Sequence, residues 1–225
     1  MTRFFEFWFN NTRNKILVLL ILADICFIFL SIIHETFNFL NDANWSITKD
    51  RGFAEIFQYI KEAWIFIILF FCWIRSFTLL YFSWTFLFFY ILIDDSLQIH
   101  ERFGSKLASF FDFQPAFGLR SIDFGELIIY LVSFSLIILL LAISFYKSSL
   151  EERKISKNLF FLLAGLAFFG IFLDFLDVIV NYMEYHSITI FTETVEDGGE
   201  MLMISIITYY VLNLDPQNKI ILRAN

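Results

Sequence analysis

Four carboxylates lie close together in residues 193–200, which read ETVEDGGE at the start of the last long apolar stretch of the chain. They are Glu193, Glu196, Asp197 and Glu200. At 100° per residue they fall within roughly a third of a helical turn, so a helix here has one acidic face. Such a face can bind a cation or transfer a proton, and the pair Gly198-Gly199 lets another backbone or a bound ion come close. We expect other helices to bring polar side chains to meet this face.

A second segment whose side chains could bind a metal ion or transfer a proton, residues 94–101, reads DDSLQIHE and ends another apolar stretch. His100 is the best single candidate for a metal ligand, because the adjacent Glu101 can orient a neutral imidazole. The chain has 23 acidic residues against three histidines, and both cysteines lie within apolar stretches. This balance favours Mn, Fe, Mg or Ca over Zn or Cu. The predicted ligands of a divalent metal ion are Asp94, His100, Glu101, Asp177 and Glu200, and the predicted catalytic carboxylates are Glu196 and Asp174.

Some acidic residues lie in sequence rich in Phe, Ile and Leu, where a carboxylate costs several kcal/mol unless it is paired, protonated or hydrated. These are Asp24, Asp94, Asp174 and Asp177. Three neutralising arrangements stay open: a basic partner such as Lys61 or Arg102, protonation through mutual repulsion, or a bound divalent cation. Other acids are expected at solvated helix ends: Glu35, Glu55, Glu62, Asp123 and Glu184.

Composition determines which elements must position these residues. Hydrophobic residues make up 59% of the 225-residue chain, charged residues 17%, and the mean hydropathy is +0.70. These values exclude a soluble domain and indicate a multi-pass membrane protein. The solid apolar stretches lack the alternation of barrel strands, so the spans must be helices.

The predicted fold is all-α: one polytopic helical bundle of about six transmembrane helices that forms a single domain over residues 1–225. Residues 1–14 are expected to lie in the headgroup layer as an aromatic and charged anchor. The predicted spans are about 15–34, 53–75, 76–104, 122–146, 158–183 and 193–214, with a charged loop over 148–157.

The charged residues predict the orientation. With six spans, ten Lys and Arg residues fall on the face that carries both termini and six fall on the other face. The positive-inside rule then makes both termini cytoplasmic. Of the 23 acids, 19 fall in the outer half or outside, so the outer face is strongly acidic. We expect a multi-pass protein of a cell membrane.

The two segments at residues 94–101 and 193–200 also resemble a pattern found in other proteins. An Asp-Asp-x4-His-Glu segment over residues 94–101, paired with a Glu-Asp-x2-Glu-Met segment over residues 196–201, resembles a pattern in uncharacterised multi-pass bacterial membrane proteins. The resemblance covers a small part of the chain. It implies that these positions act together and that the membrane is a bacterial inner membrane.

Three functions follow from these patterns. The leading hypothesis is a metal-dependent membrane enzyme, a hydrolase or oxidase, that acts on a lipid-like substrate from the outer leaflet. The second is a proton- or cation-coupled transporter that uses Asp24 and Asp174, although the inner half of the last span offers only Ser205, Thr208 and Tyr209 as polar residues. The third is a non-catalytic subunit of a membrane complex. Nucleic-acid binding is not expected, because the basic residues form no patch.

Overall fold

The computed structural model describes residues 12–37, 42–116, 119–173, 176 and 186–214. The fold is all-α, as predicted: 87% of the structure is helical, with seven α-helices in the described part of the chain. They are α2 (Thr12–Phe37), α3 (Phe53–Ser76), α4 (Leu79–Leu97), α5 (Ile99–Phe111), α6 (Ser121–Tyr146), α7 (Leu150–Ala167) and α9 (His186–Leu212). A 3-10 turn, η1 (Ala43–Trp45), precedes α3, and a π-helical segment, η2 (Phe168–Leu173), continues α7.

Five of these described helical segments are long and apolar enough to cross a membrane. They are Asn14–Phe37, Phe53–Ser76, Leu79–Leu97, Ser121–Tyr146 and Leu150–Leu173. These apolar helices are compatible with an integral membrane protein in contact with a lipid bilayer. α9 matches them in length, but the acids in its first half lower its apolar character.

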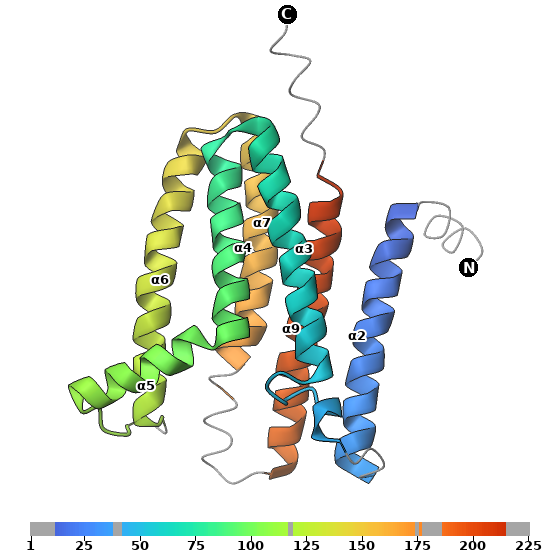
Figure 1. The fold of residues 1–225 in the computed structure, drawn as a ribbon, viewed down its shortest axis with the longest axis vertical. Helices are drawn as coiled ribbons and strands as arrows, with labels where there is room; N and C mark the ends of the chain where they lie inside the picture. Colours follow the sequence, from blue (N-terminus) through green and yellow to red (C-terminus); the bar gives the residue numbers. More distant parts are fainter. Residues whose placement is uncertain (1–11, 38–41, 117–118, 174–175, 177–185, 215–225) are drawn as a thin grey trace, which may run out of the picture.

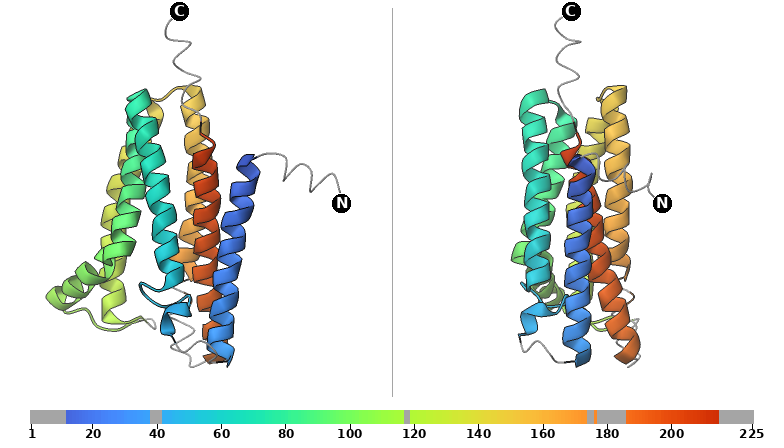
Figure 2. Two further views of the ribbon diagram at one scale, coloured as in Figure 1. Left: turned by 45° about the vertical axis from the view of Figure 1, so that its right-hand side comes forward. Right: turned by 90° about the vertical axis from the view of Figure 1, so that its right-hand side faces the viewer.

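The long helices run along one axis, and α5 lies across one end of the bundle (Figures 1 and 2). α3 packs against α4 and α9, while α2 lies at the edge of the bundle and packs mainly on α9. α6 packs on α4 and α5 and only lightly on α7. α5 approaches α6 closely because Gly104 and Gly125 face each other, and a Cβ at Gly125 would overlap the Gly104 carbonyl.

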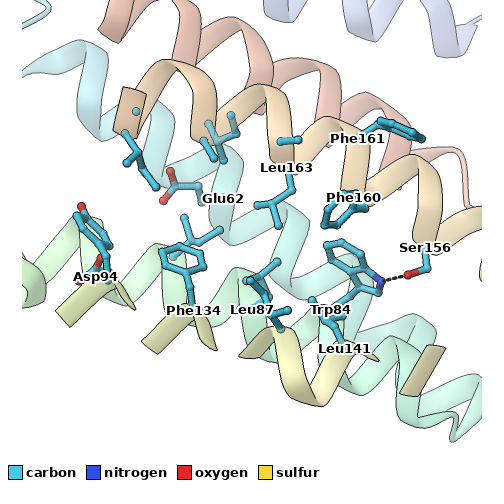
Figure 3. Close-up of a pocket in the computed structure, with 18 of the residues that line it drawn as sticks. Glu62, Trp84, Leu87, Asp94, Phe134, Leu141, Ser156, Phe160, Phe161 and Leu163 are labelled. Carbon is cyan, nitrogen blue, oxygen red and sulfur yellow. Dashed lines mark hydrogen bonds between the residues drawn. The ribbon is translucent and has the colours of Figure 1, made fainter. Parts of the chain in front are cut away.

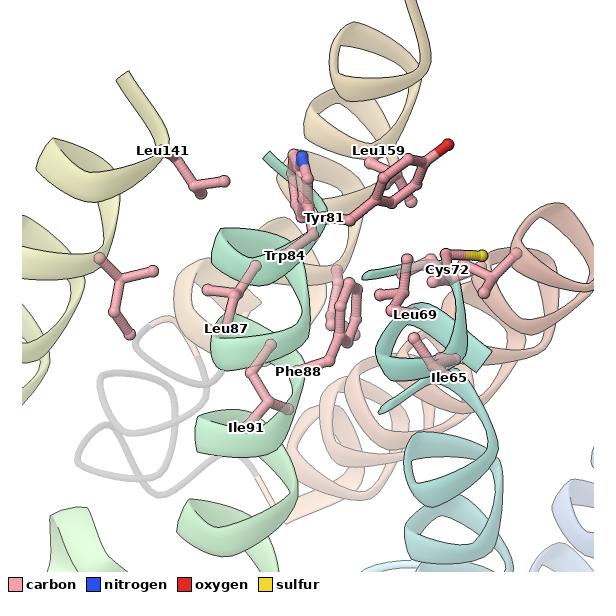
Figure 4. Close-up of a cluster of buried hydrophobic side chains, with 14 of the residues drawn as sticks. Ile65, Leu69, Cys72, Tyr81, Trp84, Leu87, Phe88, Ile91, Leu141 and Leu159 are labelled. Atoms are coloured by element: carbon pink, nitrogen blue, oxygen red, sulfur yellow. The ribbon is translucent and has the colours of Figure 1, made fainter. Parts of the chain in front are cut away.

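The core lies where α3, α4, α7 and α9 meet (Figure 4). Leu69, Leu87 and Leu159 from three of these helices are fully buried there, together with Ile204 and Ile207 of α9. The outer faces are also apolar, as Leu19 and Leu131 show. Since lipid is as apolar as these side chains, close van der Waals packing holds the core together more than the exclusion of water does.

Three helix boundaries differ from the predicted spans. The last helix, α9, begins at His186 and not at residue 193. The stretch 76–104 is two helices, because Gln98 adopts a left-handed conformation with φ 52° and turns the chain from α4 into α5. The stretch 148–157, predicted to be a loop, is helical from Leu150 onward. A capping box between Ser149 and Glu152 starts α7 there, with the Ser149 backbone N–H donating to Glu152 Oε2 at 2.8 Å.

Candidate functional site

A cavity of about 1030 Å³ lies among α3, α4, α6, α7 and α9 (Figure 3). Its walls are largely apolar and include Leu87, Phe134, Leu141 and Leu163. At one end, Trp84 Nε1 donates a hydrogen bond to Ser156 Oγ at 3.0 Å. The opposite end is polar. The cavity therefore has the shape and lining of a site for an elongated apolar molecule with one polar group.

The cavity is open along the side of the bundle where α6 and α7 pack lightly. Leu131 of α6 and Phe161 of α7 both line it, and they are 69% and 73% exposed. In a membrane, these surfaces face hydrocarbon. A molecule from the bilayer can therefore reach the cavity sideways, without passing through water.

Five polar side chains from three helices line the polar end: Gln58, Glu62, Asp94, Asp95 and Glu200. Gln58 Nε2 donates to Glu200 Oε2 at 3.1 Å and so joins α3 to α9. Gly170 of η2 lines the same end, and a Cβ there would overlap the Glu200 carboxylate. The absence of a side chain at Gly170 gives the Glu200 carboxylate room beside η2.

Glu62 is the most unusual member of this group. Its side chain is 0% exposed, and neither carboxylate oxygen accepts a hydrogen bond of normal geometry from a donor in the described residues, although the Gln58 side chain lies close. Asp95 lies within hydrogen-bonding reach, but an ionised carboxylate has no proton to donate, so the two can form a hydrogen bond only when one of them is protonated. Glu200 adds a further negative charge nearby. Carboxylates this close in an apolar cavity require a proton or a cation among them.

The nearest base in the sequence, Lys61, points away from the cavity. Its ammonium group donates to Asp24 Oδ1 at 2.7 Å, to the Met201 carbonyl at 2.8 Å and to Ser205 Oγ at 3.1 Å. Ser205 Oγ in turn donates to the second oxygen of Asp24. Lys61 and Asp24 are both 0% exposed. For Asp24, the structure therefore shows the first of the three neutralising arrangements, a basic partner. Because Lys61 donates its hydrogen bonds to these groups, it does not neutralise the acidic end of the cavity.

Asp94 and His100 form a pair at the junction of α4 and α5. Asp94 Oδ1 accepts from the His100 backbone N–H at 2.9 Å, and Asp94 Oδ2 lies 3.1 Å from Nδ1. The imidazole stacks on Tyr130, with ring centroids 4.8 Å apart, and Nε2 lies 3.9 Å from Glu101 Oε1. Burial alone would lower the pKa of His100. The hydrogen bond and charge of Asp94, with the charges of Glu101 and Glu126, raise that pKa above its ordinary value.

The structure distributes the predicted site residues over several places. Asp94 and His100 are in contact, Glu101 is beside them, and Glu200 lies at the acidic end of the cavity. Glu196 lies on α9, one turn before Glu200. Asp174 and Asp177 lie outside the described residues. Within the described ranges, no group of three or more His, Cys, Asp or Glu has an arrangement that could hold a metal ion. The divalent metal site has no support there and stays a prediction.

Two expectations of a solvated carboxylate were wrong. Glu62 is completely buried, and Asp123 is 7% exposed and held by Arg120, whose guanidinium lies 2.7 Å from Asp123 Oδ1. Gln58 and Glu62 are four residues apart in the sequence and so share one face of α3. Their depth was not evident, because α4 and α9 cover the start of α3 and only the tertiary packing shows this.

The chain belongs to the family of DUF8692, a domain of unknown function, which matches residues 59–214. The matched region contains Glu62, Asp95 and Glu200, whereas α2 with Asp24 lies outside it. Comparisons with curated proteins and with solved structures gave no match.

Proposed function

We propose that this chain is an integral membrane protein of six spans that takes a lipid-like substrate from the bilayer into the cavity and transforms it there. The acid–base groups in this proposal are Glu62, Asp95 and Glu200. One observation carries the proposal: a cavity open to the apolar side of the bundle ends at Glu62, a buried carboxylate without a hydrogen-bond donor in the described residues. Buried ionisable groups inside a membrane are commonly functional.

The sixth span in this proposal is α9. Ile204, Ile207 and Val211 of α9 are fully buried in the core, and the helix runs the length of the bundle beside α2, α3 and α7 (Figure 1). Its acids lie in the first half, where Glu200 contributes to the lining of a cavity. An even number of spans, together with the distribution of Lys and Arg, supports cytoplasmic termini and an acidic end of the cavity near the outer surface.

The chemistry in this proposal is proton transfer. A carboxylate oxygen that accepts no hydrogen bond from the protein can take a proton from a substrate hydroxyl, amine or water. Asp95, when protonated, can supply a proton at the same end of the cavity, because both carboxyl groups line it. The apolar walls exclude water and strengthen each of these interactions. A divalent ion predicted from the sequence would add Lewis-acid chemistry, and its presence is tested separately.

Transport is a second candidate, and one observation favours it. Polar contacts continue inward from Lys61 along the interface of α2, α3 and α9. Ser205 joins the Asp24–Lys61 pair, and one helical turn further on Tyr209 donates to Asn14 Oδ1 at 2.9 Å. Such a series of groups could pass protons from the Asp24–Lys61 pair toward the inner side.

The test compares the wild-type protein with Glu62→Gln, which keeps the shape of the side chain and removes its basicity. Purified protein is incubated with a total membrane lipid extract, and mass spectrometry records species that are consumed or formed. We expect turnover by the wild type and a drop on the order of 100-fold in Glu62→Gln. The matched control is Glu55→Gln, because Glu55 lies two turns earlier on α3 and accepts from the Arg51 backbone outside the cavity.

Two further measurements separate the alternatives. Elemental analysis of wild type and Glu62→Gln shows whether a stoichiometric metal ion depends on the cavity. Transport would be favoured if the wild type carried protons into liposomes without any lipid turnover and Asp24→Asn abolished this flux. Equal lipid turnover in the wild type and Glu62→Gln would contradict the proposed enzyme.

A further inference from the structure

We infer that the polar group seated at the acidic end of the cavity is the protonated amine of a long-chain amphiphile. This inference rests on the proposed function, since it names the class of molecule that the same cavity would take. It depends on three features of the structure: the charge at the acidic end, the geometry of the carboxylates and the length of the apolar walls.

The charge at the acidic end selects a cation. Glu62, Asp95 and Glu200 bring carboxyl groups together, and Gln58 is the neutral amide among them. In the described lining, the basic side chain is that of Lys157, which follows Ser156 near the opposite end of the cavity (Figure 3). A phosphate or carboxylate headgroup at the acidic end would meet like charges, whereas a cation would neutralise them.

The geometry of the carboxylates favours an ammonium group over a bare metal ion. A metal ion draws three or more oxygens to about 2.0–2.6 Å, and the described residues contain no group so arranged. An ammonium group donates three hydrogen bonds at about 2.8 Å and so spans a wider set of acceptors. Both oxygens of Glu62 are available to accept from it. An amine would thus supply the donors that Glu62 lacks in the described protein.

The apolar part of the cavity determines the length and apolar character of the rest of the bound amphiphile. Trp84 and Asp94 line its two ends on α4, ten residues apart, which corresponds to about 15 Å along a helix. The walls between them include Leu87, Phe134 and Leu141. A space of this length and lining suits an alkyl chain, and the exposed sides of α6 and α7 let a longer chain continue into the bilayer.

The test uses four probes that share one twelve-carbon chain: dodecylamine, dodecyltrimethylammonium, dodecanol and dodecanoic acid. Their affinities for the protein in nanodiscs of neutral lipid are measured at neutral pH by competition with a fluorescent alkyl probe. We expect dodecylamine to bind about tenfold or more tightly than dodecanol, because hydrogen bonds to a charged group are worth more than neutral ones. Dodecyltrimethylammonium, a cation without N–H donors, should fall between them, and dodecanoic acid should bind most weakly.

Glu62→Gln should reduce the preference for dodecylamine over dodecanol by about tenfold while leaving the affinity for dodecanol unchanged. The control Glu55→Gln should keep the wild-type preference. Equal affinity for dodecylamine and dodecanol would overturn the inference but leave a lipid-binding cavity in place. If none of the four probes binds, the proposed function itself is contradicted. Stoichiometric binding of Mn²⁺ that Glu62→Gln abolishes would also overturn the inference, because the cation would then be a metal ion.

Discussion

At the scale of single residues, Asp94 has two tasks that meet at the junction of α4 and α5. Its side chain lines the cavity and also holds His100 through two contacts, one to the backbone and one to the ring. The raised pKa of His100 has a defined consequence for stability. A histidine with a raised folded-state pKa stabilises the fold fully below its ordinary pKa of about 6.5. This stabilisation is lost as the pH rises through the folded-state value.

The pKa of His100 provides a direct test of this pair. We expect NMR titration to give His100 a pKa above about 6.5 in the wild type, because Asp94 favours the charged imidazole. In Asp94→Asn the burial of the ring remains while the charge is gone, so the pKa of His100 should fall. An unchanged pKa in the variant would show that Asp94 does not hold the proton on His100. Assignment is simple, since the chain has three histidines.

Some of the acidic side chains that line the cavity were predicted to lie together, and the most buried one was not. The segment containing Asp94 and His100 was identified because acid and imidazole stand close together in an otherwise apolar stretch. Glu200 was identified because it belongs to the acidic face of residues 193–200. Glu62 was assigned to a solvated helix end, because its neighbours Glu55, Gln58 and Lys61 are also polar. Only the packing of α4 and α9 on this part of α3 shows that Glu62 is inside.

At the scale of helices, α2 is attached to the rest of the bundle by a buried ion pair. Asp24 of α2 contacts Lys61 of α3, and Lys61 also donates to α9. The family match begins at residue 59, so this pair joins a helix outside the matched region to one inside it. Breaking a buried pair leaves an unpaired charge and costs more than replacing both partners.

Asp24→Asn should therefore lower the free energy of unfolding by about 3 kcal/mol. The double variant Asp24→Asn, Lys61→Met should recover much of that loss, because no buried charge is then left without a partner. Thermal unfolding in detergent at one pH, followed by circular dichroism, measures both variants. If the double variant is no more stable than Asp24→Asn, the unpaired ammonium group is not the source of the loss.

The all-α class of the fold followed from composition, whereas the ends of the helices depended on local geometry. Long apolar stretches can only be helices in a membrane, so the all-α fold was predictable. The left-handed turn at Gln98 was not, since glutamine gives no signal for it. The early start of α7 follows from the capping box of Ser149 and Glu152, which the many charges of that segment concealed.

At the scale of the whole molecule, the helices divide the polar residues into two sites on different faces of α3. Lys61 faces α2 and α9, where an ion pair fixes the structure, while Glu62 faces the cavity. Adjacent residues on one helix point about 100° apart, so a single turn of α3 serves both sides. The cavity, which opens toward α6 and α7, thus lies away from α2, the helix outside the family match.

A high-resolution map of the protein in lipid nanodiscs, prepared without added ligand, tests the central claim most directly. The claim predicts elongated non-protein density between α6 and α7 that passes along Leu87 and Phe134 and ends within hydrogen-bonding distance of the Glu62 carboxylate. The same density should be weaker in Glu62→Gln. A cavity filled by the protein's own side chains, or density that stays outside α6 and α7 and never reaches Glu62, would contradict it.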